Sequence, residues 1–204
     1  MQALQETAMF LRQQFRVPLV AVTGSNGKTS TKEMIASILS CRGQVLKTEG
    51  NLNNLIGLPL TLCRLSSQVD SVVLELGMNA LGEIRKLTKI CQPDIGVITN
   101  IGPAHIGHLG SMEEISRAKG ELFEEMGPGS VAVVNNDDPY CRNLAKCAGK
   151  VITFGLGKGA DIWAENIRQK DHLVFTMHID GESLPITIPL LGRHNVYNAL
   201  AAAS

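Results

Sequence analysis

The sequence predicts an α/β fold of the P-loop type, with a mostly parallel sheet, helices on both faces and a small appended antiparallel β-sheet. Between residues 17 and 154, short apolar runs alternate with amphipathic stretches of helical length, which is the pattern that builds parallel sheets. A glycine-bearing loop separates the first apolar run from the helical stretch that follows it. After residue 161 the apolar residues alternate with a period of two, which favours antiparallel strands.

The composition is that of an ordinary globular domain. Of the 204 residues, 44% are hydrophobic, and 19 basic residues balance 19 acidic ones. This balance argues against nucleic acid or an anionic membrane as a partner, and no apolar run approaches the roughly 18 residues of a membrane span. Five widely spaced cysteines without a C-x-x-C pair favour reduced thiols and a cytoplasmic location. We expect a monomer.

The first half of the chain predicts three helices and three strands. A helix over residues 2–15 ends before Pro18, and a strand over 19–22 enters the glycine-bearing loop. A helix over 30–40 follows, and a short strand at 45–46 comes next. A helix over 55–65, with Pro59 near its start where proline is tolerated, precedes a buried strand over 69–76. The expected buried stripe of the 30–40 helix consists of Met34, Ile35, Ile38 and Leu39.

The second half continues the alternation. Helices are expected over 80–91, 111–126 and 138–147, the last one capped by Asp137 or Asp138. Strands are expected over 94–100, 130–135 and 151–154. Two or three antiparallel strands then cover 162–188, with a tight turn at Asp180-Gly181. A last helix begins near His194, and its apolar run stops at Ser204 without a capping residue, so we expect the chain to be part of a longer one.

The loop Thr23-Gly24-Ser25-Asn26-Gly27-Lys28-Thr29, called the phosphate loop below, is typical of a nucleoside triphosphate site. Backbone N–H groups of such a loop and of the following helix bind phosphates, Lys28 adds a charge and the Thr29 hydroxyl is placed to bind Mg²⁺. The strict pattern G-x-x-x-x-G-K-[ST] is not met, because Val22 occupies the position of its first glycine. A chance Gly-Lys-Thr in a turn is the alternative. The expected nucleotide-binding residues are Gly24, Ser25, Asn26, Gly27, Lys28, Thr29 and Ser30.

Polar residues close the apolar strands where ligands bind in open α/β sheets. Glu75 lies inside an apolar strand, where burial without a partner would cost several kcal/mol. Mg²⁺ is the preferred partner, and a structural ion pair is the alternative. His105 follows the next strand and is as consistent with a surface role as with a functional one, whereas Lys119, taken alone, is typical of a solvated charge on a helix.

Several motifs together resemble the central ATPase domain of the Mur ligases, the ATP-dependent amino-acid ligases of peptidoglycan synthesis. The phosphate loop matches that family's variant, which explains Val22. The string Gly-Asn-Leu-Asn-Asn at 50–54 resembles the branch of the family that adds D-Ala-D-Ala to UDP-MurNAc-tripeptide. The resemblance covers nearly the whole chain, and its other motifs are Glu-Leu-Gly-Met-Asn at 75–79, Gly-Glu-Ile at 82–84, Ala-Lys-Gly-Glu at 118–121 and Gly-Arg-His-Asn-Val-Tyr-Asn-Ala at 192–199.

The resemblance implies that ATP converts the peptide's carboxylate into an acyl phosphate, which the amine of D-Ala-D-Ala then attacks. Lys28 would hold the β and γ phosphates, and Thr29 and Glu75 one Mg²⁺. His105 would help to hold a second Mg²⁺. Carbamylation by CO₂ would turn Lys119 into an oxygen ligand, which needs a neutral amine with a lowered pKa.

The same resemblance implies further roles. Asn195 and Asn198 would contact the adenine, although Asn195 could instead cap its helix. Asn51 would lie near the reacting carboxylate, and Asn53 and Asn54 belong to the same expected substrate loop.

By the same resemblance, residues 1–16 are a linker helix from a missing N-terminal domain, and residues 17–204 are the central ATP-binding domain without the C-terminal one. Such a chain would show little or no ligase activity alone, because the site is only half assembled. The alternatives are another Mur ligase, a ligase like folylpolyglutamate synthetase, and a nucleotide-binding scaffold without catalysis. Substrate dependence of ATP turnover would separate the ligases, and a functional Lys28→Ala variant would favour the scaffold.

Overall fold

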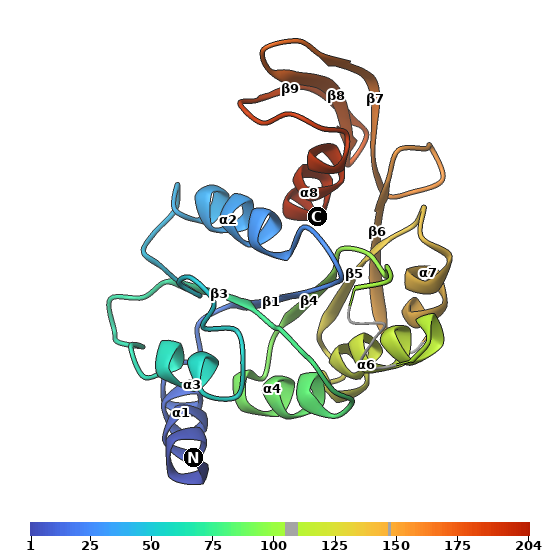
Figure 1. Cartoon of the computed structure of the whole chain (residues 1–204). Helices are drawn as coiled ribbons and strands as arrows, with labels where there is room; N and C mark the ends of the chain where they lie inside the picture. The colour runs from blue at the N-terminus through green and yellow to red at the C-terminus, as the bar shows by residue number, and fades with distance from the viewer. Residues whose placement is uncertain (105–109, 147) are drawn as a thin grey trace.

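A single twisted sheet organises the computed structural model, which describes residues 1–104, 110–146 and 148–204. Within these residues nine strands follow the order β2-β3-β1-β4-β5-β6-β7-β8-β9 (Figure 1). Neighbouring strands from β2 to β7 are parallel, and the β7-β8 and β8-β9 pairs are antiparallel. The strands are β1 (Leu19–Thr23), β2 (Val45–Lys47), β3 (Ser71–Glu75), β4 (Ile95–Ile98), β5 (Val131–Asn135), β6 (Lys150–Gly155), β7 (Ile162–Gln169), β8 (Leu173–Ile179) and β9 (Glu182–Ile188). The predicted fold class is confirmed, and the antiparallel strands extend the edge of the main sheet through the β6-β7 pairing.

Helices cover both faces of the parallel part of the sheet (Figure 1). One face carries α2 (Lys28–Leu39) and α8 (His194–Ala203). The opposite face carries α1 (Gln2–Gln14), α3 (Gly57–Leu62), α4 (Glu83–Cys91), α6 (Met112–Glu125) and α7 (Pro139–Ala145). Side chains of β1 alternate between the two layers, with Val20 and Val22 toward α2 and α8, and Leu19 and Ala21 toward the other helices. Burial on both faces explains why this strand reads as a continuous apolar run.

Local signals in the sequence identified two connections correctly. Asp138 is the N-cap of α7, and its side chain accepts hydrogen bonds from the backbone N–H groups of Tyr140 and Cys141. Asp137 instead accepts from the Leu156 N–H and the Tyr197 hydroxyl. At the β8-β9 turn, Asp180 and Gly181 both have positive φ angles, of 51° and 83°, as a two-residue hairpin turn requires.

The predicted buried stripe of α2 is wrong at Ile38, whose side chain is 51% exposed. The helix is rotated so that Thr31, Lys32, Ile35 and Ala36 are buried. Because residues one and four positions apart define the buried face here, Ile38 falls outside that face, and it lines an apolar groove beside β8 and β9. The burial of a lysine in this set was not predicted.

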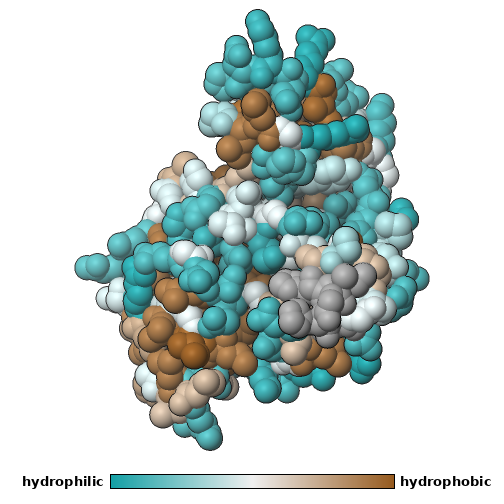
Figure 2. Space-filling model, viewed as in Figure 1, coloured by the Kyte–Doolittle hydropathy of each residue, from teal (hydrophilic) through white to brown (hydrophobic). Residues whose placement is uncertain are grey.

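The surface seen in Figure 2 has apolar side chains gathered over α3 and the neighbouring part of α1. The exposed large apolar residues of these two helices and their boundaries are Met1, Phe10, Ile56 and Leu60. Among the residues that the structure describes, no helix is long and apolar enough to cross a bilayer.

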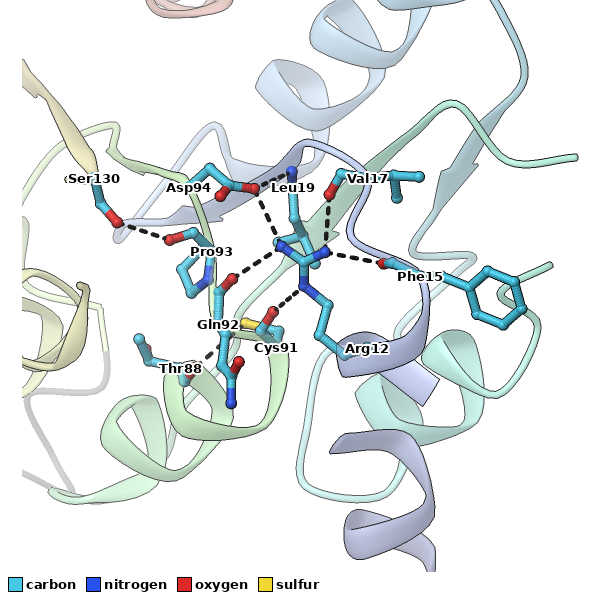
Figure 3. Close-up of polar contacts among 10 residues, drawn as sticks. All are labelled: Arg12, Phe15, Val17, Leu19, Thr88, Cys91, Gln92, Pro93, Asp94 and Ser130. Atoms are coloured by element: carbon cyan, nitrogen blue, oxygen red, sulfur yellow. Dashed lines mark hydrogen bonds and ion pairs between the residues drawn. The ribbon is translucent and has the colours of Figure 1, made fainter. Parts of the chain in front are cut away.

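Arg12 connects α1 to the amino ends of β1 and β4 (Figure 3). Its guanidinium, which is almost fully buried, donates hydrogen bonds to the Asp94 carboxylate and to four backbone carbonyl oxygens. All five of its N–H donors are therefore satisfied. The four carbonyl oxygens belong to Phe15, Val17, Cys91 and Gln92.

Candidate functional site

The phosphate loop connects the carboxyl end of β1 to the start of α2. Gly24 and Gly27 have φ angles of 146° and 80°, and a Cβ atom on either would clash, with the side chain of Thr99 or of Asn198. Only glycine fits both the backbone and the space at these positions. Val22 precedes the loop as a buried residue of β1, paired in register with Glu75. The strand therefore continues through the position at which the strict motif has its first glycine.

The first turn of α2 presents backbone N–H groups at this end of the sheet. Gly27 is the N-cap of α2, and no side chain caps the helix among the residues that the structure describes. Uncapped N–H groups at a helix N-terminus are donors for an anion, and the helix dipole adds to their attraction. This geometry supports phosphate binding at residues 27–30.

The segment after β4 fixes the shape of the phosphate loop. The Ser25 N–H donates to the Asn100 carbonyl at 2.9 Å. The Asn100 side chain bonds both the N–H and the carbonyl of Asn26, at 3.0 Å each. The Thr99 hydroxyl donates to the same Asn26 carbonyl at 2.6 Å. Because these contacts occupy the Ser25 and Asn26 amides, the two residues shape the loop, and any role at a nucleotide would fall to their other atoms.

Glu75 is a buried carboxylate held by neutral donors. Its side chain accepts hydrogen bonds from the Thr29 hydroxyl at 2.8 Å and from the Asn53 amide at 2.9 Å, and the residue is 3% exposed. Within the described part of the chain, no lysine, arginine or histidine forms an ion pair with it. The structural ion pair considered from the sequence is therefore not formed by these residues.

The donor set around Glu75 fits a hard divalent cation. A carboxylate next to a threonine hydroxyl offers the oxygen ligands that Mg²⁺ takes in proteins. In the described residues no group of three or more His, Cys, Asp or Glu side chains is placed to hold a metal ion. Mg²⁺ commonly binds through one or two protein carboxylates, keeps several waters and takes other ligands from substrate phosphates, so Glu75 beside the Thr29 hydroxyl suits it.

Lys119 is buried, contrary to the expectation from its local sequence alone. It lies on α6 and is 1% exposed, and its ammonium donates to the Gly24 carbonyl at 3.0 Å. Burial, and secondarily the charge of Lys28, lower the pKa of Lys119 to about 7. The desolvated amine that the family resemblance requires is therefore present in the structure.

Lys28 and Lys119 meet at one backbone carbonyl. The Lys28 ammonium also donates to the Gly24 carbonyl, at 2.9 Å, and to that of Ser25 at 3.2 Å. Burial lowers the pKa of Lys28, and the charge of Glu75 partly offsets this effect. Lys28, near the Glu75 carboxylate, and Lys119, at the same carbonyl, are cationic groups that can attract an anion to this end of the sheet.

A cleft of about 440 Å³ opens next to the two lysines. Its polar wall includes Asn53 and Asn54, and its apolar wall includes Leu55, Ile56 and Met78. The Asn54 side chain accepts from the Ile56 and Gly57 N–H groups and so also stabilises the start of α3. Asn51 is exposed on the same loop.

Asn195 and Asn198 lie on α8 against the phosphate loop. Both are buried, and the Asn198 amide donates to the Asn195 side-chain oxygen at 3.0 Å. The Thr31 hydroxyl of α2 donates to Asn198 at 3.3 Å. The N-cap of α8 is Arg193, so the capping role considered for Asn195 is wrong.

The structure brings together all but one of the predicted charged site residues. His105 falls in residues 105–109, outside the described residues, and its role stays a prediction. The bonds that Thr99 and Asn100 make to the phosphate loop were not predicted, although the position of Asn100 at a strand end is a signal for them. The burial of Lys32 was not predicted either, because the local sequence offers no signal for it.

Comparisons with known proteins agree with this geometry. Residues 22–204 match the Mur ligase middle domain. The chain is 45% identical over 202 residues to the UDP-N-acetylmuramoyl-tripeptide–D-alanyl-D-alanine ligase of Synechocystis, covering 98% of this chain and 42% of the relative. It is 41% identical to the ligase of the same name from Escherichia coli, covering 99% of this chain and 46% of that one. The chain thus spans less than half the length of these curated relatives.

Solved structures show the same likeness. The crystal structure of MurF from Acinetobacter baumannii superposes with a TM-score of 0.94 at 38% identity, over 99% of this chain and 45% of that one. MurF from Thermotoga maritima, determined in complex with ADP, gives a TM-score of 0.91 at 28% identity, over 98% of this chain and 47% of the other.

Proposed function

Because this chain belongs to the Mur ligase family, we propose that it is the ATP-binding part of a ligase that adds D-Ala-D-Ala to a UDP-MurNAc-tripeptide. The observation that carries the proposal is the convergence of Lys28, Lys119, Thr29 and Glu75 at the first turn of α2. The names of the similar proteins supply the substrates. Residues 17–204 would form the ATP-binding domain and residues 1–16 a linker to a preceding domain.

In this function the chain's own residues position and neutralise phosphate groups. The N–H groups at the start of α2 and the Lys28 ammonium would bind the β and γ phosphates of ATP. Thr29 and Glu75 would hold Mg²⁺, which supplies charge neutralisation for phosphoryl transfer when bound. The terminal carboxylate of the tripeptide would attack the γ-phosphorus, releasing ADP and forming an acyl phosphate. The amine of D-Ala-D-Ala would then displace phosphate to form the amide.

Lys119 would act as a carbamate in this site. With a pKa of about 7, a large fraction of its amine is neutral near neutral pH. The neutral nitrogen would add to the carbon of CO₂ and lose a proton to water, which gives an anionic oxygen ligand. His105 would help this carbamate to hold a second Mg²⁺.

The cleft beside Lys28 and Lys119 suits the peptide end of the nucleotide-linked substrate. Its asparagines offer donors and acceptors to a peptide, and Leu55, Ile56 and Met78 offer apolar contact. We assign Asn51, Asn53 and Asn54 to this substrate, and Asn195 and Asn198 to the adenine. The five widely spaced cysteines fit reduced thiols in the cytoplasm, and we take the chain to be a monomer.

Calorimetric titration of the 204-residue chain with ADP, with and without Mg²⁺, tests the nucleotide site. Lys28→Ala should weaken MgADP binding by at least about tenfold, whereas Lys47→Ala, at a partly exposed lysine, should not. Intact-mass measurement in bicarbonate should reveal a labile CO₂ adduct that Lys119→Ala lacks. A chain that binds no nucleotide under any of these conditions would contradict the proposed nucleotide site.

A further inference from the structure

Lys32 is a buried lysine that the proposed chemistry does not use. It lies on α2 one turn after Thr29 and is 1% exposed. Its ammonium donates to the Thr48 carbonyl at 2.7 Å and pairs with the Glu33 carboxylate at 2.9 Å. Burying an ammonium group is costly unless it is paired and hydrogen-bonded. An apolar side chain would fill the same space without that cost, so the ammonium itself needs an explanation.

Thr48 connects Lys32 to Glu75. The Thr48 side chain is fully buried, and its hydroxyl accepts a hydrogen bond from the Glu75 N–H at 2.9 Å. Its own N–H donates to the Val73 carbonyl at 3.1 Å. Thr48 therefore closes the end of β2 against β3 at the residue that carries the carboxylate.

The loop that begins at Thr48 also reaches the Glu75 carboxylate directly. Asn53 of this loop donates to one carboxylate oxygen at 2.9 Å, and its carbonyl accepts from the Gly77 N–H at 2.8 Å. The loop thus holds Glu75 at its backbone through Thr48 and at its carboxylate through Asn53. Lys32 holds the first residue of that loop in place.

Two residues of α2 consequently act on the same carboxylate by different routes. Thr29 contacts the second oxygen of Glu75 at 2.8 Å, and Lys32 acts through Thr48. We propose that Lys32 is a positioning residue of the metal site, which orients Glu75 next to Thr29 by fixing Thr48. This role rests on the proposed function, because it takes Thr29 and Glu75 as the ligands of Mg²⁺. Removing groups that orient metal ligands commonly lowers metal affinity by about 10–100-fold.

Lys32→Met tests the role, because methionine keeps an unbranched apolar stem and removes the ammonium. We would titrate the 204-residue chain with ADP by calorimetry at a series of Mg²⁺ concentrations. The Mg²⁺ concentration that gives half of the full effect on ADP affinity should rise about tenfold in the variant. ADP affinity without Mg²⁺ should stay within about twofold, since the α2 amides and Lys28 are unchanged. A merely structural lysine would lower the thermal unfolding midpoint without shifting the Mg²⁺ requirement.

Lys47→Met is the matched control. Lys47 pairs with the same Glu33 carboxylate from the solvent side, where its side chain is 39% exposed. Its substitution removes a partner of Glu33 while Lys32 and Thr48 remain. The Mg²⁺ requirement of Lys47→Met should therefore equal that of the unsubstituted chain.

Thr48 provides a second pair of variants that decides the question if Lys32→Met does not fold. Thr48→Val removes the hydroxyl that accepts from the Glu75 N–H, and Thr48→Ser keeps it. Thr48→Val should reproduce the higher Mg²⁺ requirement, and Thr48→Ser should not. An unchanged requirement in folded Lys32→Met, or equal behaviour of the two Thr48 variants, would overturn the role of Lys32. If the unsubstituted chain binds ADP without any Mg²⁺ dependence, the proposed function fails together with this role.

Discussion

Two polar networks lie at opposite ends of β1 and β4, and they differ in how completely the buried cation is hydrogen-bonded. At the amino ends, the Arg12 guanidinium uses all five N–H donors on carbonyl oxygens and the Asp94 carboxylate (Figure 3). At the carboxyl ends, the Lys119 ammonium makes one hydrogen bond to the residues that the structure describes, to a Gly24 carbonyl that it shares with Lys28. Every N–H donor of Arg12 is hydrogen-bonded, whereas within the described residues Lys119 uses one of its three.

This difference separates a structural network from a functional one. Satisfying every donor of a buried cation stabilises the fold. Two poorly compensated lysines beside a buried carboxylate reduce stability, and such a cost is typical of sites that are completed by a ligand. Substitutions at the two ends should therefore change the free energy of unfolding in opposite directions.

The largest expected effect is at Arg12. Arg12→Met would leave four carbonyl oxygens without their donor and remove the link between α1, α4 and β1. We expect the free energy of unfolding to fall by about 3 kcal/mol, measured by urea denaturation. Arg16→Met, at an exposed arginine two residues before Pro18, should change it by less than about 0.5 kcal/mol. A loss below about 1 kcal/mol at Arg12 would show that the network contributes little.

The next effect is a pH dependence that belongs to Lys119. The pKa of Lys119 falls from 10.5 to about 7 on folding, so between these values the unfolded chain binds one more proton than the folded chain. The free energy of unfolding therefore rises as the pH increases from 7 toward 10.5, and this gain is lost as the pH falls back to 7. The difference in unfolding free energy between the unsubstituted chain and Lys119→Met should change by about 2 kcal/mol between pH 7 and pH 9. Urea denaturation at several pH values, without bicarbonate, measures this difference. A pH-independent difference would mean that the Lys119 ammonium is exposed to solvent in the folded chain.

The two buried lysines, Lys32 and Lys119, show the limit of what the sequence can predict. Local signals were sufficient for the parallel sheet, for the phosphate loop, for the Asp138 cap and for the turn at Asp180-Gly181. They were insufficient for Lys32 and Lys119, because a lysine on a helix looks the same whether it is solvated or buried. The partner of Lys119 lies 95 residues away in the sequence. Such burial depends on how α6 packs beside the phosphate loop, which no local pattern encodes. Ile38 was misplaced for the same reason.

A smaller effect of the opposite sign to that at Arg12 is expected at Glu75. Glu75→Gln removes a buried charge that, among the described residues, accepts side-chain hydrogen bonds from neutral groups alone, and it keeps an oxygen that can accept from Thr29 or Asn53. The free energy of unfolding should rise by about 1 kcal/mol, while the Mg²⁺ dependence of ADP binding should disappear. Glu49 lies on the loop that also carries Asn53 and forms an exposed ion pair with Arg64. Glu49→Gln should change neither the free energy of unfolding nor the Mg²⁺ dependence. Lower stability in Glu75→Gln would mean that the carboxylate is structural.

The smallest expected effect is at Asp94, the one charged partner of Arg12 in its network. Asp94→Asn keeps an oxygen that can accept from the Leu19 N–H, which donates to it at 2.8 Å, and removes the negative charge. The Asp94 side chain is 59% exposed, so water and salt screen its attraction to Arg12. We expect a loss of about 0.5 kcal/mol at low ionic strength, and a smaller one in about 1 M NaCl, where the screening length is only about 3 Å. Urea denaturation at the two salt concentrations measures both values. A salt-independent loss of several kcal/mol would instead mean that the Arg12 network depends on the ion pair more than on the carbonyl oxygens, and the carbonyl oxygens would then no longer explain why Arg12 is stable in its buried position.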